Sequence, residues 1–132
     1  MPRIDGVLET SLYVDDMKRS ARFYHDLLGF EIAVSGERLI AMQVAGKPQL
    51  LLLFKKGASA SLPKTPHDGD GRLHLAFAIP AEELGAWEAR LREQGVDVID
   101  RVTWERGGVS LYFRDPDGHL VELATPGVWT VY

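Results

Sequence analysis

The stretch LETSLYVDDMKRSARFYHDLLG, which runs from Leu8 to Gly29, decides the fold because its pattern returns later in the chain. Its first seven residues alternate and are rich in β-forming types, which predicts a strand. Asp15 and Asp16 are suited to cap a helix N-terminus, and apolar residues then recur at helical spacing. Gly29 predicts the end of that helix, because glycine tolerates the left-handed conformation of a C-cap.

The stretch LHLAFAIPAEELGAWEARLREQG, residues 73–95, repeats this order. A strand is followed by Pro80, by acidic residues that favour a helix start, and by Gly95 at the predicted helix end. Three further strands are predicted after each helix. They are residues 30–34, 38–44 and 50–54 in the first half, and 96–99 (with an extension to Trp104 left open), 109–114 and 120–124 in the second.

The repeat predicts an α+β fold with two βαβββ units. We place the first unit at residues 5–56, a linker rich in Gly, Ser, Pro and Asp at 57–71, and the second unit at 72–126. Because one face of each sheet carries a helix, we expect curled mixed sheets that form a cup with the helices on the outside. The length of 132 residues favours a single domain.

The composition excludes several classes of protein. The chain has no cysteine, which excludes a disulfide scaffold, a thiolate zinc site and a cysteine nucleophile. The formal net charge of -4 argues against a nucleic-acid surface. No apolar run approaches the roughly 20 residues that cross a bilayer, and the N-terminus has no apolar signal-peptide core. We therefore expect a cytoplasmic protein without nucleic-acid or membrane partners.

Strand alternation places three ionisable side chains on the face away from the helices: Glu9, His74 and Glu122. One imidazole and two carboxylates suit a divalent ion such as Zn, Fe, Mn, Ni or Co, with open positions for water or a substrate oxygen. Such an ion polarises a carbonyl without a protein nucleophile.

Each of these residues also has a structural interpretation. Glu9 is either a ligand or an exposed glutamate at a strand start, and these readings are evenly balanced. We favour the ligand role for His74, which is a lone polar group in an apolar strand. Glu122 is the strongest candidate, because a carboxylate between apolar neighbours is rarely buried without a partner or a metal. His67, in the linker, either caps the pocket or lies on a mobile loop, and we favour the loop.

Three aromatic residues are candidates for substrate binding: Tyr13, Trp104 and Tyr112. All three are predicted to line the cup, and packing within the sheet or a dimer explains them equally well. The C-terminal segment PGVWTVY is apolar enough to seal an interface between two chains.

Three segments, LETSLYVDDMKRSARFYHDLLGFEI, GRLHLAF and SLYFRDPDGHLVELATPG, resemble the vicinal oxygen chelate superfamily of glyoxalases, bleomycin-resistance proteins and extradiol dioxygenases. The resemblance implies that His74 and Glu122 are the metal ligands of the second unit. Glu9 stands where the family usually carries His or Gln, and Leu52 stands near the position of a further Glu in glyoxalase I. The chain therefore departs from both the glyoxalase I and the dioxygenase ligand sets.

This resemblance implies a metal-dependent enzyme that acts on a small oxygenated molecule through bidentate chelation. Glyoxalase-type lyase or isomerase chemistry is our first expectation and dioxygenase chemistry the second. Glu122 or Glu9 would act as the catalytic base. The alternative is a metal-free protein that binds or sequesters a small molecule, as bleomycin-resistance proteins do. We also expect a homodimer, because family cups of this length are usually completed across two chains.

Overall fold

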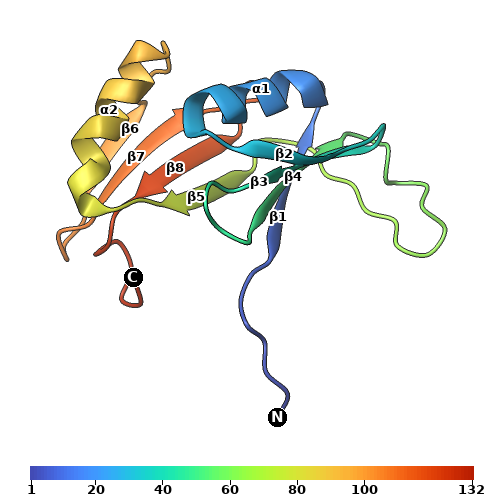
Figure 1. Cartoon of the computed structure of the whole chain (residues 1–132), viewed down its shortest axis with the longest axis horizontal. Helices are drawn as coiled ribbons and strands as arrows, with labels where there is room; N and C mark the ends of the chain where they lie inside the picture. Colours follow the sequence, from blue (N-terminus) through green and yellow to red (C-terminus); the bar gives the residue numbers. More distant parts are fainter. The chain divides into compact units, whose positions relative to one another are not determined.

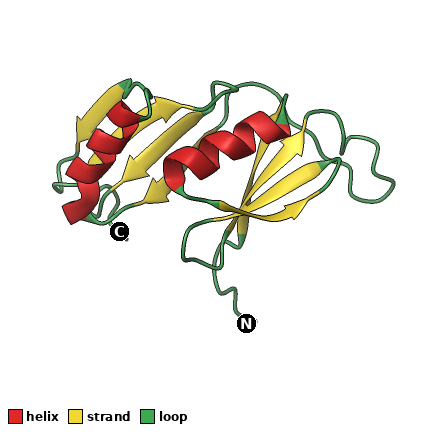
Figure 2. Ribbon diagram, turned by 45° about the horizontal axis from the view of Figure 1, so that its top comes forward, coloured by secondary structure: helices red, strands yellow, loops and turns green.

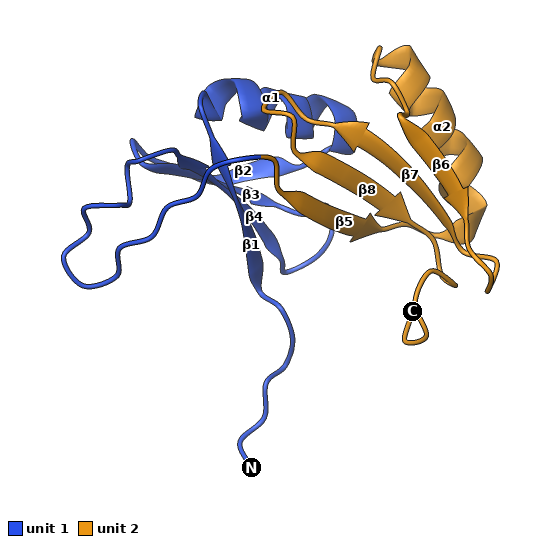
Figure 3. Ribbon diagram, turned by 180° about the vertical axis from the view of Figure 1, so that it is seen from behind, with its two compact units in different colours: residues 1–71 blue, residues 72–132 orange.

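The computed structural model describes residues 1–132, and the chain divides into two compact units, residues 1–71 and 72–132 (Figure 3). Each unit holds one α-helix and one four-stranded sheet (Figure 2). Unit 1 contains β1 (Glu9–Val14), α1 (Met17–Leu28), β2 (Glu31–Ser35), β3 (Leu39–Gln43) and β4 (Leu50–Lys55). Unit 2 contains β5 (His74–Ala78), the short 3₁₀ helix η1 (Ala81–Glu83), α2 (Leu84–Glu93), β6 (Asp100–Thr103), β7 (Val109–Arg114) and β8 (Leu120–Ala124) (Figure 1). The predicted α+β class and the two βαβββ units are confirmed.

The two sheets have the same topology. Their strand orders are β1-β4-β3-β2 and β5-β8-β7-β6, with the first strand parallel to the last and the other neighbours antiparallel. The registers also match: Glu9 lies opposite Leu50 as His74 lies opposite Leu120, and Ser11 opposite Leu52 as Ala76 opposite Glu122. Glu9 therefore corresponds to His74, and Leu52 corresponds to Glu122.

Helix α1 begins and ends where the sequence predicts. The Asp16 side chain accepts a hydrogen bond from the Arg19 backbone N–H at 3.0 Å, and this bond holds the pKa of the carboxyl below its ordinary value. Gly29 forms the C-cap with φ of 74°, and its N–H donates to the His25 carbonyl at 2.9 Å. The face of α1 that packs against β3 and β4 buries Ser20, Ala21, Tyr24, Leu27 and Leu28.

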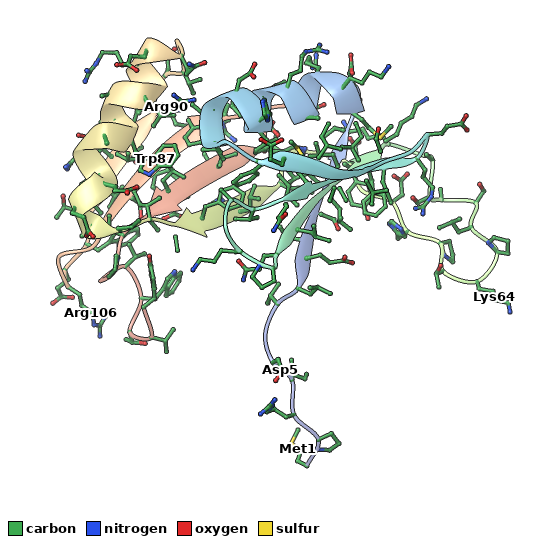
Figure 4. All side chains as sticks on the ribbon, viewed as in Figure 1. Met1, Asp5, Lys64, Trp87, Arg90 and Arg106 are labelled. Carbon is green, nitrogen blue, oxygen red and sulfur yellow. The ribbon has the colours of Figure 1, made fainter.

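Helix α2 is attached less firmly. Only Leu91 is buried on it, and the apolar residues Leu84 and Trp87 are partly exposed. Trp87 is labelled on the helix in Figure 4. No side chain caps its N-terminus. An ion pair of 2.6 Å between Arg101 Nε and Glu88 Oε1 joins β6 to the helix. Neither helix is long and apolar enough to cross a membrane.

The hydrophobic core of each unit lies on one face of its sheet. Strand alternation predicts part of this core: Leu12, Val14, Leu75, Leu111 and Leu123 are buried as expected, whereas Thr10 is exposed and Phe77 and Val109 are partly exposed. The buried side chains are Leu12, Val14, Ile40, Met42, Leu51 and Leu53 in unit 1, and Leu75, Leu111, Phe113, Val121 and Leu123 in unit 2. Full burial of one such side chain is worth about 1.5–3 kcal/mol, so these rows hold the strand faces in place.

The strand predicted at residues 96–99 is wrong. In the structure β6 begins at Asp100, within the extension toward Trp104 that the sequence left open, and residues 96–99 follow the end of α2 without strand structure. The Val96 N–H donates to the Leu91 carbonyl at 2.9 Å, so this segment still satisfies the helix end. Pairing with β7 starts only with the Ile99 N–H. The hydrogen bond that ends the helix therefore competes with strand pairing for a segment that β propensity alone assigns to a strand.

Candidate metal centre

Polar side chains gather on the open face of sheet 2, the face turned away from its core. β5 contributes His74 at its first residue, β8 contributes Glu122, and β7 contributes Ser110 and Tyr112. In the register, Glu122 lies between Ala76 on β5 and Tyr112 on β7. The small neighbour on one side leaves room beside the carboxylate.

His74 and Glu122 form the centre of this face. The His74 Nε2 atom lies 3.3 Å from Glu122 Oε2. The imidazole side chain is 51% exposed and the carboxylate side chain 8% exposed. The pair therefore places a buried acceptor next to a ring that an incoming molecule can reach.

A backbone contact sets the orientation of the His74 ring. Its Nδ1 atom lies 3.0 Å from the Leu120 carbonyl oxygen, which can only accept, so Nδ1 carries the hydrogen. In the neutral ring the lone pair is then on Nε2, the atom that faces Glu122. The Nε2 lone pair and the adjacent carboxylate oxygen can therefore both coordinate one metal ion. A ligand histidine typically has this arrangement, with its second nitrogen bonded to a carbonyl.

The carboxylate of Glu122 is held by a chain of hydrogen bonds. The Ser110 hydroxyl donates to Glu122 Oε1 at 2.5 Å, and Trp104 Nε1 donates to the same Ser110 oxygen at 2.8 Å. Ser110 is fully buried, and Trp104 is 38% exposed. One carboxylate oxygen is thereby occupied, and the other faces His74.

Tyr112 borders the same pair. Its ring centroid lies 6.3 Å from that of His74. Burial raises the pKa of the Tyr112 phenol; the neighbouring Ser110 hydroxyl lowers it, and the charge of Glu122 together with a hydrogen bond to its carboxylate raises it further. The phenol therefore stays protonated at neutral pH and can donate to a bound oxygen atom.

The donor set fits a divalent metal ion. Two ligands at about 2.1 Å from one ion, at angles between octahedral and tetrahedral, lie about 3.0–3.4 Å apart. The separation of His74 Nε2 and Glu122 Oε2 falls in this range. Neither unit gathers three His, Asp or Glu side chains around one point. Glu9 belongs to unit 1, so its part in a site with His74 and Glu122 stays a prediction.

The open face of sheet 1 carries Glu9 and Tyr13 but is otherwise mostly apolar. Glu9 is exposed at the start of β1. Tyr13, further along the strand, stacks on Phe54 with a centroid distance of 5.8 Å, and its hydroxyl lies 2.8 Å from His67 Nδ1. His67 itself packs edge-on against Phe54 at 4.6 Å. His67 lies in a loop, as predicted, and its ring packs on the sheet through Tyr13 and Phe54.

Polar contacts tie the loop that carries His67 to unit 1. Arg38 Nη1 donates to the buried Ser59 hydroxyl at 2.7 Å, and the Asp68 carboxylate accepts from the Gly57 N–H at 3.0 Å. Farther from these anchors, Lys64 lies exposed in the loop (Figure 4). The loop is therefore positioned by its own side chains and not only by its ends.

Two polar residues of unit 2 have roles that sequence reasoning missed. Alternation places Ser110 on the open face, but its bond to Glu122 depends on the hairpin register. His119 follows the DPDG turn and resembles a simple turn residue. It is 1% exposed, and its Nδ1 accepts from the Leu73 N–H at 2.9 Å. The apolar residues Leu120 and Val121 that follow His119 were a signal for its burial.

Comparisons with known proteins identify related sequences and structures. The model of the Glyoxalase/Bleomycin resistance protein/Dioxygenase superfamily matches residues 4–123. The metallothiol transferase FosB of Bacillus licheniformis is 31% identical over 128 residues, which is 96% of this chain and 79% of that enzyme. The catechol-2,3-dioxygenase of Bacillus subtilis is 31% identical over 115 residues, 85% of this chain but only 38% of that enzyme.

A solved structure also matches over nearly the full length. It is the lactoylglutathione lyase from Agrobacterium tumefaciens, with a TM-score of 0.89 and 28% identity over 98% of this chain and 99% of that one. The family model covers most of the chain, and it covers the strands that carry His74 and Glu122. This chain belongs to the Glyoxalase/Bleomycin resistance protein/Dioxygenase superfamily.

Proposed function

We propose that the chain is a metal-dependent enzyme that acts on a small oxygenated molecule. His74 and Glu122 hold a divalent ion, and Glu9 supplies the third protein ligand. The observation that carries this proposal is the 3.3 Å separation of His74 Nε2 and Glu122 Oε2, with each side chain oriented by a separate partner. Such an ion, when bound, polarises a substrate oxygen and makes the attached carbon more electrophilic.

The side chains around the site have distinct tasks in this proposal. Tyr112 borders the His74 ring, so it is placed to donate a hydrogen bond to a substrate oxygen. Glu122 is held at one oxygen by Ser110, so it serves as a fixed ligand. Of the two carboxylate ligands, Glu9 is exposed at its strand start, so it is the better candidate to give up its ligand role and accept a substrate proton. Trp104 and Tyr112 form part of the wall that contacts the substrate.

Transfer of a thiol is the favoured reaction class. Curated relatives at 29–33% identity are named metallothiol transferases, and the chain spans most of their length. In such a step the thiol sulfur bonds to an electrophilic carbon. The bond from that carbon to oxygen breaks, its electron pair stays on the oxygen, and the thiol proton ends on that oxygen. Lyase or isomerase chemistry is the second candidate, supported by the structural match to a lactoylglutathione lyase.

Metal binding tests the proposal directly. We expect the wild-type chain to bind one Mn²⁺, Zn²⁺, Ni²⁺, Co²⁺ or Fe²⁺ ion in titration calorimetry. His74→Ala should lower the affinity by more than about 100-fold, beyond the loss typical of an outer-shell partner. Glu9→Ala should also weaken binding. His25→Ala is the matched control, because His25 lies in unit 1 with its Nδ1 atom 2.9 Å from the Phe30 carbonyl.

Equal metal affinity in the wild type and His74→Ala would overturn the proposal. Binding of small organic molecules by a chain that takes up no metal would favour the sequestration alternative instead. If metal binds, thiol consumption with electrophilic oxygenated substrates, compared with and without chelator, separates the transferase from the lyase.

We further propose that the chain is a cytoplasmic homodimer. Light scattering tests the dimer, and cell fractionation tests the location.

A further inference from the structure

We propose that Ser110 is a positioning residue that holds Glu122 in the orientation needed to bind the metal. This inference rests on the proposed function, because it takes Glu122 as a ligand. It goes further by assigning a role to a residue that touches neither metal nor substrate.

The donors and acceptors in the chain of hydrogen bonds allow only one direction. The indole N–H of Trp104 can only donate, and an ionised carboxylate can only accept. The Ser110 oxygen therefore accepts from Trp104 at 2.8 Å and sends its own proton to Glu122 Oε1 at 2.5 Å. Trp104 thereby directs the Ser110 hydroxyl proton toward the carboxylate.

Burial makes this bond decisive for the carboxylate. Ser110 is fully buried and Glu122 is 6% exposed, so water is poorly placed to replace the hydroxyl. With Oε1 occupied by Ser110, Oε2 is the oxygen next to His74 Nε2. Without the serine hydroxyl, the carboxylate can rotate or turn the wrong oxygen to the ion. Outer partners of this kind typically contribute 10–100-fold, to order of magnitude, in metal affinity.

The experiment measures metal affinity by competition with a fluorescent chelator, using Zn²⁺ and Co²⁺ and the full chain. We expect Ser110→Ala to weaken binding about 10–100-fold and to change the visible spectrum of bound Co²⁺. Ser110→Thr keeps the hydroxyl, and its register neighbour Ala124 is small, so it should restore most of the affinity. Trp104→Phe should give a smaller loss of metal affinity than Ser110→Ala. The Ser110 hydroxyl remains in that variant, but no indole N–H orients its proton toward Glu122.

Ser59→Ala is the matched control. Ser59 is also buried and hydrogen-bonded, but it lies in unit 1 and accepts from Arg38. Its removal should leave metal affinity and the Co²⁺ spectrum unchanged. A Ser110→Ala chain that melts earlier but binds metal like the wild type would show a purely structural serine and overturn the inference. If the wild type and His74→Ala bind metal equally, the proposed function itself fails, so the two failures are distinguishable.

Discussion

At matched positions of the two sheets, Leu52 in unit 1 and Glu122 in unit 2 occupy the same place in the same register. Leu52 lies in an apolar cluster with Ala41 and Phe54, and Tyr13 packs against it. Glu122 lies among hydrogen-bonding groups. One backbone arrangement therefore supports an apolar patch in one copy and a candidate metal centre in the other.

The difference shows that the same sheet topology forms whether the side chains on its open face are apolar or polar. Each core lies on the opposite face, where both units use leucine, valine and other apolar residues. Substitutions on the open face leave that core intact. The aromatic pair Tyr13 and Phe54 of unit 1 corresponds to Ala78 and Ala124 in unit 2, so the second sheet has less bulk at the matching end of its open face.

The largest expected effect comes from giving unit 1 the residue of unit 2. In Leu52→Glu, a carboxylate replaces a side chain that is 6% exposed and packed on apolar neighbours. No serine or histidine stands at the matching positions, so we expect a loss of about 3–5 kcal/mol in the free energy of unfolding. Urea denaturation measures it.

The reverse exchange should cost far less. Glu122→Leu removes a desolvated charge but leaves the Ser110 hydroxyl without its acceptor, so we expect a net change of about 1 kcal/mol or less in the metal-free protein. Equal destabilisation by both exchanges would show that the two open faces are not as different as their contacts suggest.

The helices offer a second contrast, of intermediate size. Leu91, fully buried, is the only buried residue of α2, whereas α1 buries five. Leu91→Ala and Leu27→Ala should each cost about 3 kcal/mol. Hydrogen exchange should separate them: Leu91→Ala exposes the α2 amides, because no other buried contact holds that helix, and Leu27→Ala leaves α1 protected. Protection of α2 in the Leu91→Ala chain would contradict the weaker attachment that we infer.

A smaller effect than that of the helix substitutions is expected at the loop on sheet 1, which has no counterpart in unit 2. Tyr13→Phe removes the hydroxyl that lies 2.8 Å from His67 Nδ1, at a cost of about 1 kcal/mol. A double-mutant cycle with His67→Ala isolates the pair. A coupling energy near zero would mean that the stacking on Phe54, and not the hydrogen bond, positions the loop.

The sequence predicts the repeat, both ends of α1 and the shared face of His74 and Glu122, because these follow from local periodicity and capping. It does not predict that Ser110 bonds to Glu122, since that contact depends on the β7–β8 register. His67 reaches Tyr13 across 54 residues, a separation at which local patterns carry no information. The start of β6 is mispredicted because a helix cap competes with β propensity.

The parallel pairing of β1 with β4, and of β5 with β8, has a consequence for synthesis on the ribosome. Neither sheet is complete until its final strand has emerged, because that strand lies between the first strand and the rest. However, once Gly71 has left the ribosome, all the strands of unit 1 are available for pairing. Synthesis of the remaining chain then takes on the order of 3–12 s. The apolar face of the first sheet can thus be covered before the strands of unit 2 are available to compete. This order limits mispairing of strands between two units that have the same topology.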